Sequence, residues 1–236
     1  MKLILSTLVL LFSLSTWAFK FTPMSQTLDP SKDKNSVFYI ENDTKEPIAV
    51  QLSAAKRVMD LNGVETQPEE KENLSLYPDQ LIIPPGEKRS VKVNWLKAGK
   101  LEAEEAYRII AEQLPIEIDG KKKKAANIKV LLRYVAAFYV AQSDFESKVE
   151  ISSIAQQKDT VKFLVKNSGT KHQVLTKLSL SFKSNNKLVE LMPDELKGMV
   201  GENILANSTR EFILPLKEKL KLLKPDQKVV MNFEKE

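Results

Sequence analysis

Few residues in this chain are of the types that perform catalysis or bind metal ions. The sequence has one histidine, His172, and no cysteine, so it lacks the ligands of a conventional zinc site and of a cysteine–histidine catalytic pair. No Gly-x-Ser-x-Gly motif accompanies the histidine, which argues against a serine hydrolase. None of the seven glycines forms a phosphate-binding loop. We therefore expect a protein that is not an enzyme and that binds no metal ion or cofactor.

The remaining ionisable candidates stand in polar surroundings. His172 follows Gly169-Thr170-Lys171 beside a turn, where a lone histidine is usually a surface residue. The acidic pairs Glu69-Glu70 and Glu104-Glu105 have the residue type that general acid–base catalysis needs. Because both pairs lie in polar segments, we expect their carboxylates to be solvated.

The element that stands out is the run Asn127–Val140, NIKVLLRYVAAFYV. Every second residue from Ile128 is apolar or aromatic, which is the period of a β-strand with one apolar face. The opposite face is mixed and carries Lys129 and Arg133. The run of 14 residues is much longer than the usual strand of about 5–6 residues. Such a strand can serve its own core at one end and offer an edge to a partner at the other.

The first 18 residues have the layout of a secretory signal peptide. Met1-Lys2 is a short basic start, Leu3–Leu14 is mostly apolar, and Ser15–Ala18 offers small residues for cleavage after Ala18. The alternative is a buried N-terminal strand. No later run is comparably apolar, so we expect an exported mature chain without membrane insertion. Since it lacks cysteine, core packing alone must hold it together.

The rest of the chain reads as short strands separated by turn signals, which favours antiparallel β-sandwiches. Strand-like segments end at turn residues such as Asn62-Gly63 and Pro84-Pro85-Gly86. The polar residues Ala141–Ser147 resemble a linker, and a second series of alternating segments follows them. We predict an all-β chain with a signal peptide at 1–18, a first sandwich at 19–140, a short hinge at 141–147 and a second sandwich at 148–236.

Charge says little about partners, because the formal net charge of +5 is dispersed apart from one cluster. Lys121, Lys122, Lys123 and Lys124 follow the turn dipeptide Asp119-Gly120. They form either a solvated hairpin loop or a contact with an acidic partner or membrane surface. Nucleic acid is not an expected partner, since no aromatic residue is interleaved among these lysines.

Several motifs, in order along the chain, resemble the PapD-like periplasmic chaperones of chaperone–usher pilus assembly. The first half carries Tyr-Pro, Pro-Gly-Glu and Tyr-Arg-Ile-Ile-Ala-Glu-Gln-Leu-Pro elements, and the second half carries three further similar segments. The matching segments are Leu76–Pro78, Leu81–Gly86, Ser90–Trp95, Glu105–Pro115, Val161–Gly169, Leu175–Leu180 and Asn203–Phe212. The resemblance covers nearly the whole chain after the signal peptide, and it implies two immunoglobulin-like antiparallel β-sandwich domains joined by a short hinge.

The resemblance also implies a mechanism for the long strand. Subunits of such fimbriae lack their last strand, and the chaperone donates its own strand to pair the open edge and fill the groove. By position, Ile128, Val130 and Leu132 would enter the groove, and Tyr134 is a further candidate. Arg133 and the four lysines are candidate charged contacts. The alternative is that these residues serve only their own sandwich.

The chain departs from the family pattern at the anchor for the subunit's carboxylate. Ala137 stands where well-known members have a Lys, and Met24, Ser25 and Gln26 occupy the region of their Arg. Ala141-Gln142 also replaces the family's Pro after the donor strand. These departures indicate a divergent branch, closer to archaic pilus systems.

The resemblance implies a periplasmic chaperone whose partners are a pilus or surface-fibre subunit and an outer-membrane usher. Two rival interpretations remain open. One is a secreted two-sandwich protein that is itself a surface or fibre component. The other is a basic protein that binds acidic polymers through its lysine cluster, in which case binding would be sensitive to salt.

Overall fold

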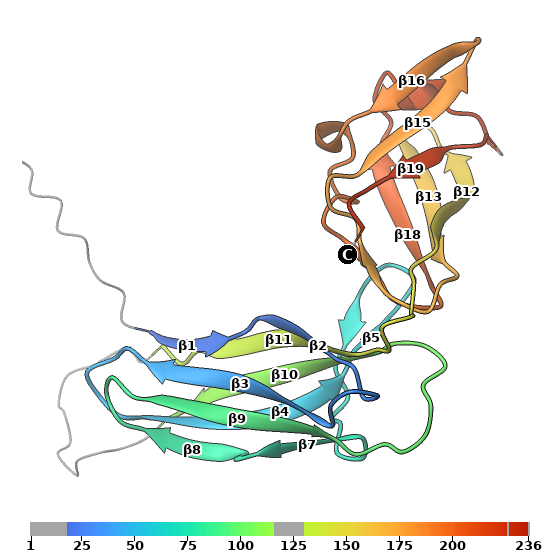
Figure 1. The fold of residues 1–236 in the computed structure, drawn as a ribbon. Helices are drawn as coiled ribbons and strands as arrows, with labels where there is room; N and C mark the ends of the chain where they lie inside the picture. The colour runs from blue at the N-terminus through green and yellow to red at the C-terminus, as the bar shows by residue number, and fades with distance from the viewer. Residues whose placement is uncertain (1–17, 116–129, 226, 236) are drawn as a thin grey trace, which may run out of the picture.

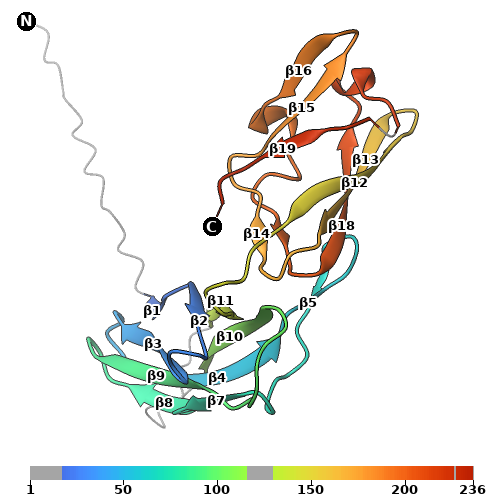
Figure 2. The ribbon, with the colours of Figure 1, turned by 45° about the vertical axis from the view of Figure 1, so that its right-hand side comes forward.

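The computed structural model describes residues 18–115, 130–225 and 227–235, which form two β-sandwich domains that meet at an angle (Figures 1 and 2). Most of the predicted signal peptide, residues 1–17, lies outside the described residues. Within the described ranges, no helix has the length and apolar character needed to cross a membrane.

Two sheets stack to form the first domain. One has the order β1-β3-β9-β7, and the other has the order β2-β11-β10-β4-β8. Every pairing is antiparallel except that of β2 with β11. The first sheet contains β1 (Phe19–Thr22), β3 (Asn35–Asn42), β9 (Lys88–Trp95) and β7 (Leu74–Tyr77); the second contains β2 (Ser25–Leu28), β11 (Arg133–Val140), β10 (Glu105–Leu114), β4 (Ile48–Lys56) and β8 (Gln80–Ile83).

The N-terminal segment of the first domain passes from one sheet to the other. β1 pairs with β3, and β2 then pairs with β11, with the cis peptide Thr22–Pro23 between them. A small hairpin, β5 (Val58–Met59) and β6 (Glu65–Thr66), projects toward the second domain (Figure 1). The change of sheet brings β2 to the edge of β11, and the hairpin lies at the end of the first domain that faces the second domain.

Alternation along the strands builds the core of the first domain. Phe38 and Ile40 of β3 face Phe138 and Val140 of β11 across the sandwich, and all four side chains are fully buried. The rings of Phe38 and Phe138 lie edge to face with centroids 6.0 Å apart. The apolar end of the predicted long strand therefore serves its own core, as a period of two requires.

A separate core fills the second domain. Its sheets have the orders β12-β13-β18 and β16-β15-β19, with a small pair β14-β17 beside them. The strands are β12 (Val149–Gln156), β13 (Thr160–Asn167), β18 (Ser208–Pro215), β16 (Lys187–Leu191), β15 (Ser179–Ser184), β19 (Val230–Asn232), β14 (Gln173–Val174) and β17 (Asn203–Ile204); two 3₁₀ turns, Pro193–Glu195 and Leu220–Leu222, complete it.

The predicted all-β fold of two immunoglobulin-like antiparallel sandwiches is confirmed, but the long strand is shorter than predicted. β11 begins at Arg133, so Val130–Leu132 do not belong to it, and residues 127–129 lie outside the described part of the chain. The reason lies in its neighbour β10, which ends at Leu114. The register that pairs Glu112 with Arg133 would place Pro115 opposite Val130, and proline has no N–H to donate.

Candidate functional site

The first half of β11 has an open backbone edge. The Ala137 N–H donates to the Met24 carbonyl at 2.9 Å, on the side of the strand away from β10. Because alternate residues of a strand direct their N–H groups to the same side, those of Val135 and Arg133 point the same way. The pairing of β2 with β11 covers only Ala137–Val140. Residues 133–136 therefore offer an edge that no ladder occupies among the described residues.

This edge lies on the inner side of the angle between the domains. In Figure 1, β1, β2 and β11 form the side of the first domain that faces the second domain, and Figure 2 agrees. A partner strand added to β11 at this edge would lie on the side of the first domain that faces the second domain.

The predicted groove-filling side chains form a graded row on the core-facing side of β11. The Tyr134 ring packs edge to face on Phe19, with centroids 4.8 Å apart, and its hydroxyl donates to the Phe19 carbonyl at 2.6 Å. Leu132 is partly buried against the first core, whereas Val130 is 73% exposed. Tyr134 therefore serves its own domain, and the availability of the row to a partner increases from Tyr134 to Val130.

The candidate charged contacts are placed only in part. The Arg133 guanidinium lies 3.8 Å from the Glu112 carboxylate on the neighbouring strand, and both side chains are about half exposed. Exposed pairs of this kind contribute roughly 0–1 kcal/mol. Ile128 and the lysines 121–124 lie outside the described residues.

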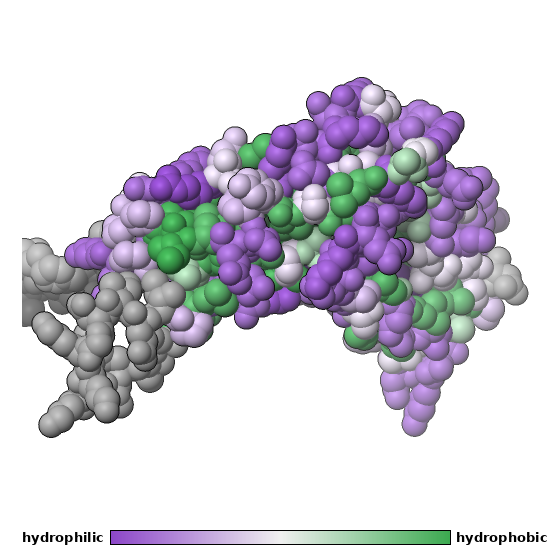
Figure 3. Space-filling model, turned by 90° about the horizontal axis from the view of Figure 1, so that it is seen from below, coloured by the Kyte–Doolittle hydropathy of each residue, from purple (hydrophilic) through white to green (hydrophobic). Residues whose placement is uncertain are grey.

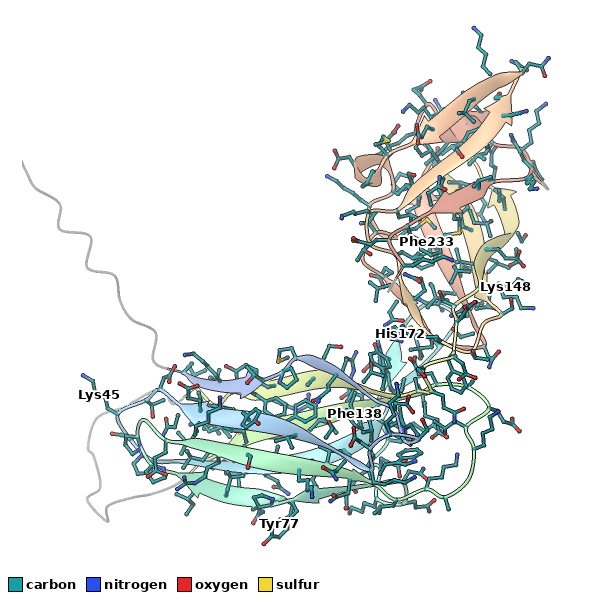
Figure 4. The ribbon with its side chains drawn as sticks, in the orientation of Figure 1. Lys45, Tyr77, Phe138, Lys148, His172 and Phe233 are labelled. Carbon is teal, nitrogen blue, oxygen red and sulfur yellow. The ribbon has the colours of Figure 1, made fainter. Side chains whose placement is uncertain are left out.

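His172 was predicted to lie on the surface and the Glu104 carboxylate to be solvated; both predictions are wrong, because both residues are buried. The histidine is 5% exposed, and its ring stacks on Tyr139 with centroids 3.8 Å apart. Its Nδ1 lies 2.7 Å from Oε1 of Glu104, whose side chain is 1% exposed. Figure 4 shows His172 where the two domains meet. The contact between the domains excludes water from the polar segments that contain Glu104 and His172.

Tyr139 is the residue that the sequence analysis missed. It lies near the end of β11 on the side opposite the core, yet it is only 4% exposed. Its hydroxyl accepts hydrogen bonds from Arg57 Nη1 and Asn203 Nδ2, both at 2.9 Å. Burial raises the pKa of the Tyr139 phenol, so it stays protonated at neutral pH. An aromatic residue on the outward face of a strand was the available signal for this contact.

A cluster of charged side chains, Glu65, Arg57 and Arg108, lies beside Tyr139 within the first domain. Glu65 of β6 accepts hydrogen bonds from Arg57 Nε at 2.8 Å and Arg108 Nε at 2.7 Å. Burial alone would raise the pKa of Glu65. The hydrogen bonds from Arg108 and Gln67 and the charges of both arginines outweigh it and lower the pKa to about 2. The cluster fixes the β5–β6 hairpin on the end of the first domain.

The face of the first domain that points away from the second domain has a mixed surface. In Figure 3, hydrophobic patches on this face are interrupted by hydrophilic residues. Ile82 of β8, which is 66% exposed, lies at the edge of the sheet opposite to β2 and β11. Among the described residues, no group of three or more His, Asp or Glu side chains could hold a metal ion.

Comparison with known proteins finds similarity in structure but not in sequence. No family model matches the chain, and no curated protein matches it. A chain of the CsuC–CsuE chaperone–tip adhesion subunit pre-assembly complex, from the archaic chaperone–usher Csu pili of Acinetobacter baumannii, is 16% identical with a TM-score of 0.62. The match covers 91% of this chain and 97% of that chain.

Two further structures have the same architecture. The class 5 fimbriae chaperone CfaA is 16% identical, with a TM-score of 0.62 over 92% of this chain and 99% of that chain. A chain of the Salmonella enterica complex of SafA pilin with the SafB chaperone is 10% identical, with a TM-score of 0.57 over 84% of this chain and 85% of that chain. At these identities the likeness establishes the two-domain fold of pilus chaperones.

Proposed function

We propose that this chain is a periplasmic chaperone that binds an incomplete immunoglobulin-like subunit of a pilus or surface fibre and passes it to an outer-membrane usher. The observation that carries the proposal is the open edge of β11 at residues 133–136, next to the exposed Val130. The solved structures of similar fold support it, since they include chaperones bound to a tip adhesion subunit and to a pilin.

Strand addition accounts for the chemistry of this edge. A subunit that lacks its last strand exposes unpaired backbone groups and an apolar groove, which makes it prone to aggregate. The N–H and C=O groups of Arg133 and Val135 would pair with the subunit's edge strand. Leu132, Val130 and, by continuation of the alternation, Ile128 would fill the groove.

The subunit's C-terminus must be held differently from the well-known family members. Ala137 is on the outward face of β11, and its N–H is already bonded to Met24. Neither residue offers a positive charge to a carboxylate. Backbone pairing and apolar contacts would therefore supply most of the affinity for the subunit.

The export and delivery steps rest on other features. The predicted signal peptide at 1–18 supports a periplasmic location, and the likeness to pilus chaperones supports delivery to an usher. We take 19–140 as the subunit-binding domain, 141–147 as the hinge and 148–236 as the second domain.

The experiment that tests the proposal is periplasmic co-expression with the small exported β-protein encoded nearest to this chain. It compares wild type, Val130→Asp and a matched control, Ile82→Asp, which also places a charge at an exposed apolar position but on the far edge of the sheet. The readout is the amount of soluble subunit that co-purifies at one to one. Because burying a carboxylate in an apolar groove costs several kcal/mol, we expect Val130→Asp to reduce recovery at least tenfold.

Two results would overturn the proposal. One is a folded Val130→Asp variant that recovers as much subunit as wild type and Ile82→Asp. The other is purified wild-type protein that polymerises by itself, as a structural fibre component would.

A further inference from the structure

The strand that offers the open edge also forms the contact between the domains. β11 has its free edge at residues 133–136 and carries Tyr139 six residues beyond Arg133. The Tyr139 hydroxyl joins Arg57 of the first domain to Asn203 of the second, and its ring covers His172 of the second domain. We call Arg57, Glu104, Tyr139, His172 and Asn203 the interdomain joint.

Backbone contacts reinforce this joint on both sides of the linker. The Glu104 N–H donates to the Thr170 carbonyl at 2.8 Å, and the His172 N–H donates to Glu104 Oε1 at 3.1 Å. From the β5–β6 hairpin, the Leu61 carbonyl accepts a hydrogen bond from the N–H of Glu211 at 2.6 Å. With contacts at separate points, the second domain is held in orientation as well as in position.

The joint is polar, and its polar groups are not all satisfied. Within the described residues, two buried atoms of the joint, Glu104 Oε2 and Asn203 Oδ1, have no hydrogen-bond partner. Each unsatisfied buried group costs about 1–3 kcal/mol, so an apolar contact would hold the domains together at lower cost. The polar groups instead restrict the relative orientation of the two domains, since hydrogen bonds and a stacked ring pair require a defined geometry.

We propose that Tyr139 is a positioning residue: it couples the donor edge of β11 to the orientation of the second domain, and thereby sets the affinity for the subunit. This inference rests on the proposed chaperone function. A subunit strand added at residues 133–136 would lie on the inner side of the angle between the domains (Figure 1), so that a fixed angle keeps the binding surface ready formed.

The direct test is the variant Tyr139→Phe, which keeps the ring on His172 and removes only the hydroxyl. Since the chain has no cysteine, Lys92→Cys and Lys187→Cys place one spin label on each domain at exposed positions. We expect double electron–electron resonance to give a narrow distance distribution for wild type and a clearly broader one for Tyr139→Phe. Tyr134→Phe is the matched control, because it removes a hydroxyl from the same strand that bonds only within the first domain.

The coupling is tested by measuring affinity for the same neighbouring subunit. We expect Tyr139→Phe to bind about tenfold more weakly than wild type, while Tyr77→Phe on the opposite side of the first domain binds as wild type (Figure 4). A Leu61→Cys, Glu211→Cys pair, at the backbone contact between the domains, allows an oxidised crosslink. In the Tyr139→Phe background, the oxidised form should recover wild-type affinity and the reduced form should not.

Each outcome separates the inference from the proposed function. An unchanged distance distribution in Tyr139→Phe would show that the Tyr139 hydroxyl does not fix the orientation of the domains. A broadened distribution with unchanged affinity overturns the coupling, as does a loss of affinity that the crosslink fails to restore, because Tyr139 would then touch the subunit directly. If wild type fails to bind any subunit, the proposed function falls, while the distance measurement still decides whether Tyr139 fixes the domains.

Discussion

At the scale of single residues, one carboxylate and two guanidinium groups meet where the β5–β6 hairpin lies on the sheet. Glu65 contacts Arg57 and Arg108, and the Arg57 guanidinium also reaches the Tyr139 hydroxyl. A carboxylate between two guanidinium groups stabilises the folded state only while it is ionised. The stability of this end of the domain should therefore depend on pH.

The prediction concerns Glu65→Gln, which resembles the protonated form of the residue. The pKa of Glu65 falls from 4.5 to about 2 on folding, so its ionisation stabilises the protein above pH 4.5 and this contribution is lost as the pH falls toward 2. Allowing for solvent screening, we expect the free energy of unfolding of wild type to exceed that of Glu65→Gln by about 1–2 kcal/mol at pH 6. This difference should close near pH 2.

Urea unfolding of both proteins at several pH values measures this gap. Glu69→Gln is the control, because its carboxylate is mostly exposed and bonds only an exposed lysine. A gap between wild type and Glu65→Gln that stays constant from pH 6 to pH 2 would contradict the assignment.

Residue types and alternation could not reveal the interdomain joint. His172 and Glu104 are 68 positions apart, and each stands in a polar segment that is typical of an exposed loop. Their burial follows from the contact of two separately folded domains, and a single sequence contains no local signal for that. Tyr139 was the partial exception, since an aromatic side chain on the face of a strand that points away from the core indicates a partner on that face.

At the scale of the elements, alternation predicted the strands well because each sandwich has one buried side per strand. Among the alternating segments after the predicted linker, Thr160–Asn167 forms β13, in which every second residue from Val161 is buried. The predicted start of β11 was wrong because a β-ladder needs two strands. The partner strand β10 ends before Pro115, so the residues opposite it cannot continue the ladder. Alternation reports which side chains face a core and does not report where the neighbouring backbone stops.

The open edge itself gives a prediction at this scale. Val135→Pro removes an N–H that no described backbone group accepts, so we expect the stability of the free protein to change by less than about 1 kcal/mol. The same substitution deletes a ladder bond to the subunit and places ring atoms in its path. We expect affinity for the subunit to fall at least tenfold, as measured by titration of the purified proteins.

Val135→Ala is the control for this variant, because it shortens the side chain and keeps the N–H group. It should bind the subunit within about twofold of wild type. Equal affinity of Val135→Pro and Val135→Ala would show that the subunit does not pair with this edge.

At the scale of the whole molecule, the two cores account for each domain but not for the angle between them. The sequence predicts a turn at Asn62-Gly63, where Gly63 has a φ of +83°. No local sequence pattern indicates that this hairpin lies against the second domain. A Cβ atom at Gly63 would overlap the Arg210 guanidinium, which is held by Glu202 Oε2 at 2.7 Å and the Asn203 carbonyl at 3.0 Å.

Gly63→Ala should therefore loosen the angle between the domains as well as strain the turn. Gly86→Ala is a matched control, since Gly86 also has a positive φ of +71° and has nothing within 4 Å of an added Cβ. The strain of about 1–2 kcal/mol is common to both variants, whereas the displacement of Arg210 belongs to Gly63→Ala alone. Small-angle X-ray scattering should show a wider spread of shapes for Gly63→Ala and a wild-type profile for Gly86→Ala; identical profiles for the two would mean that this hairpin does not set the angle.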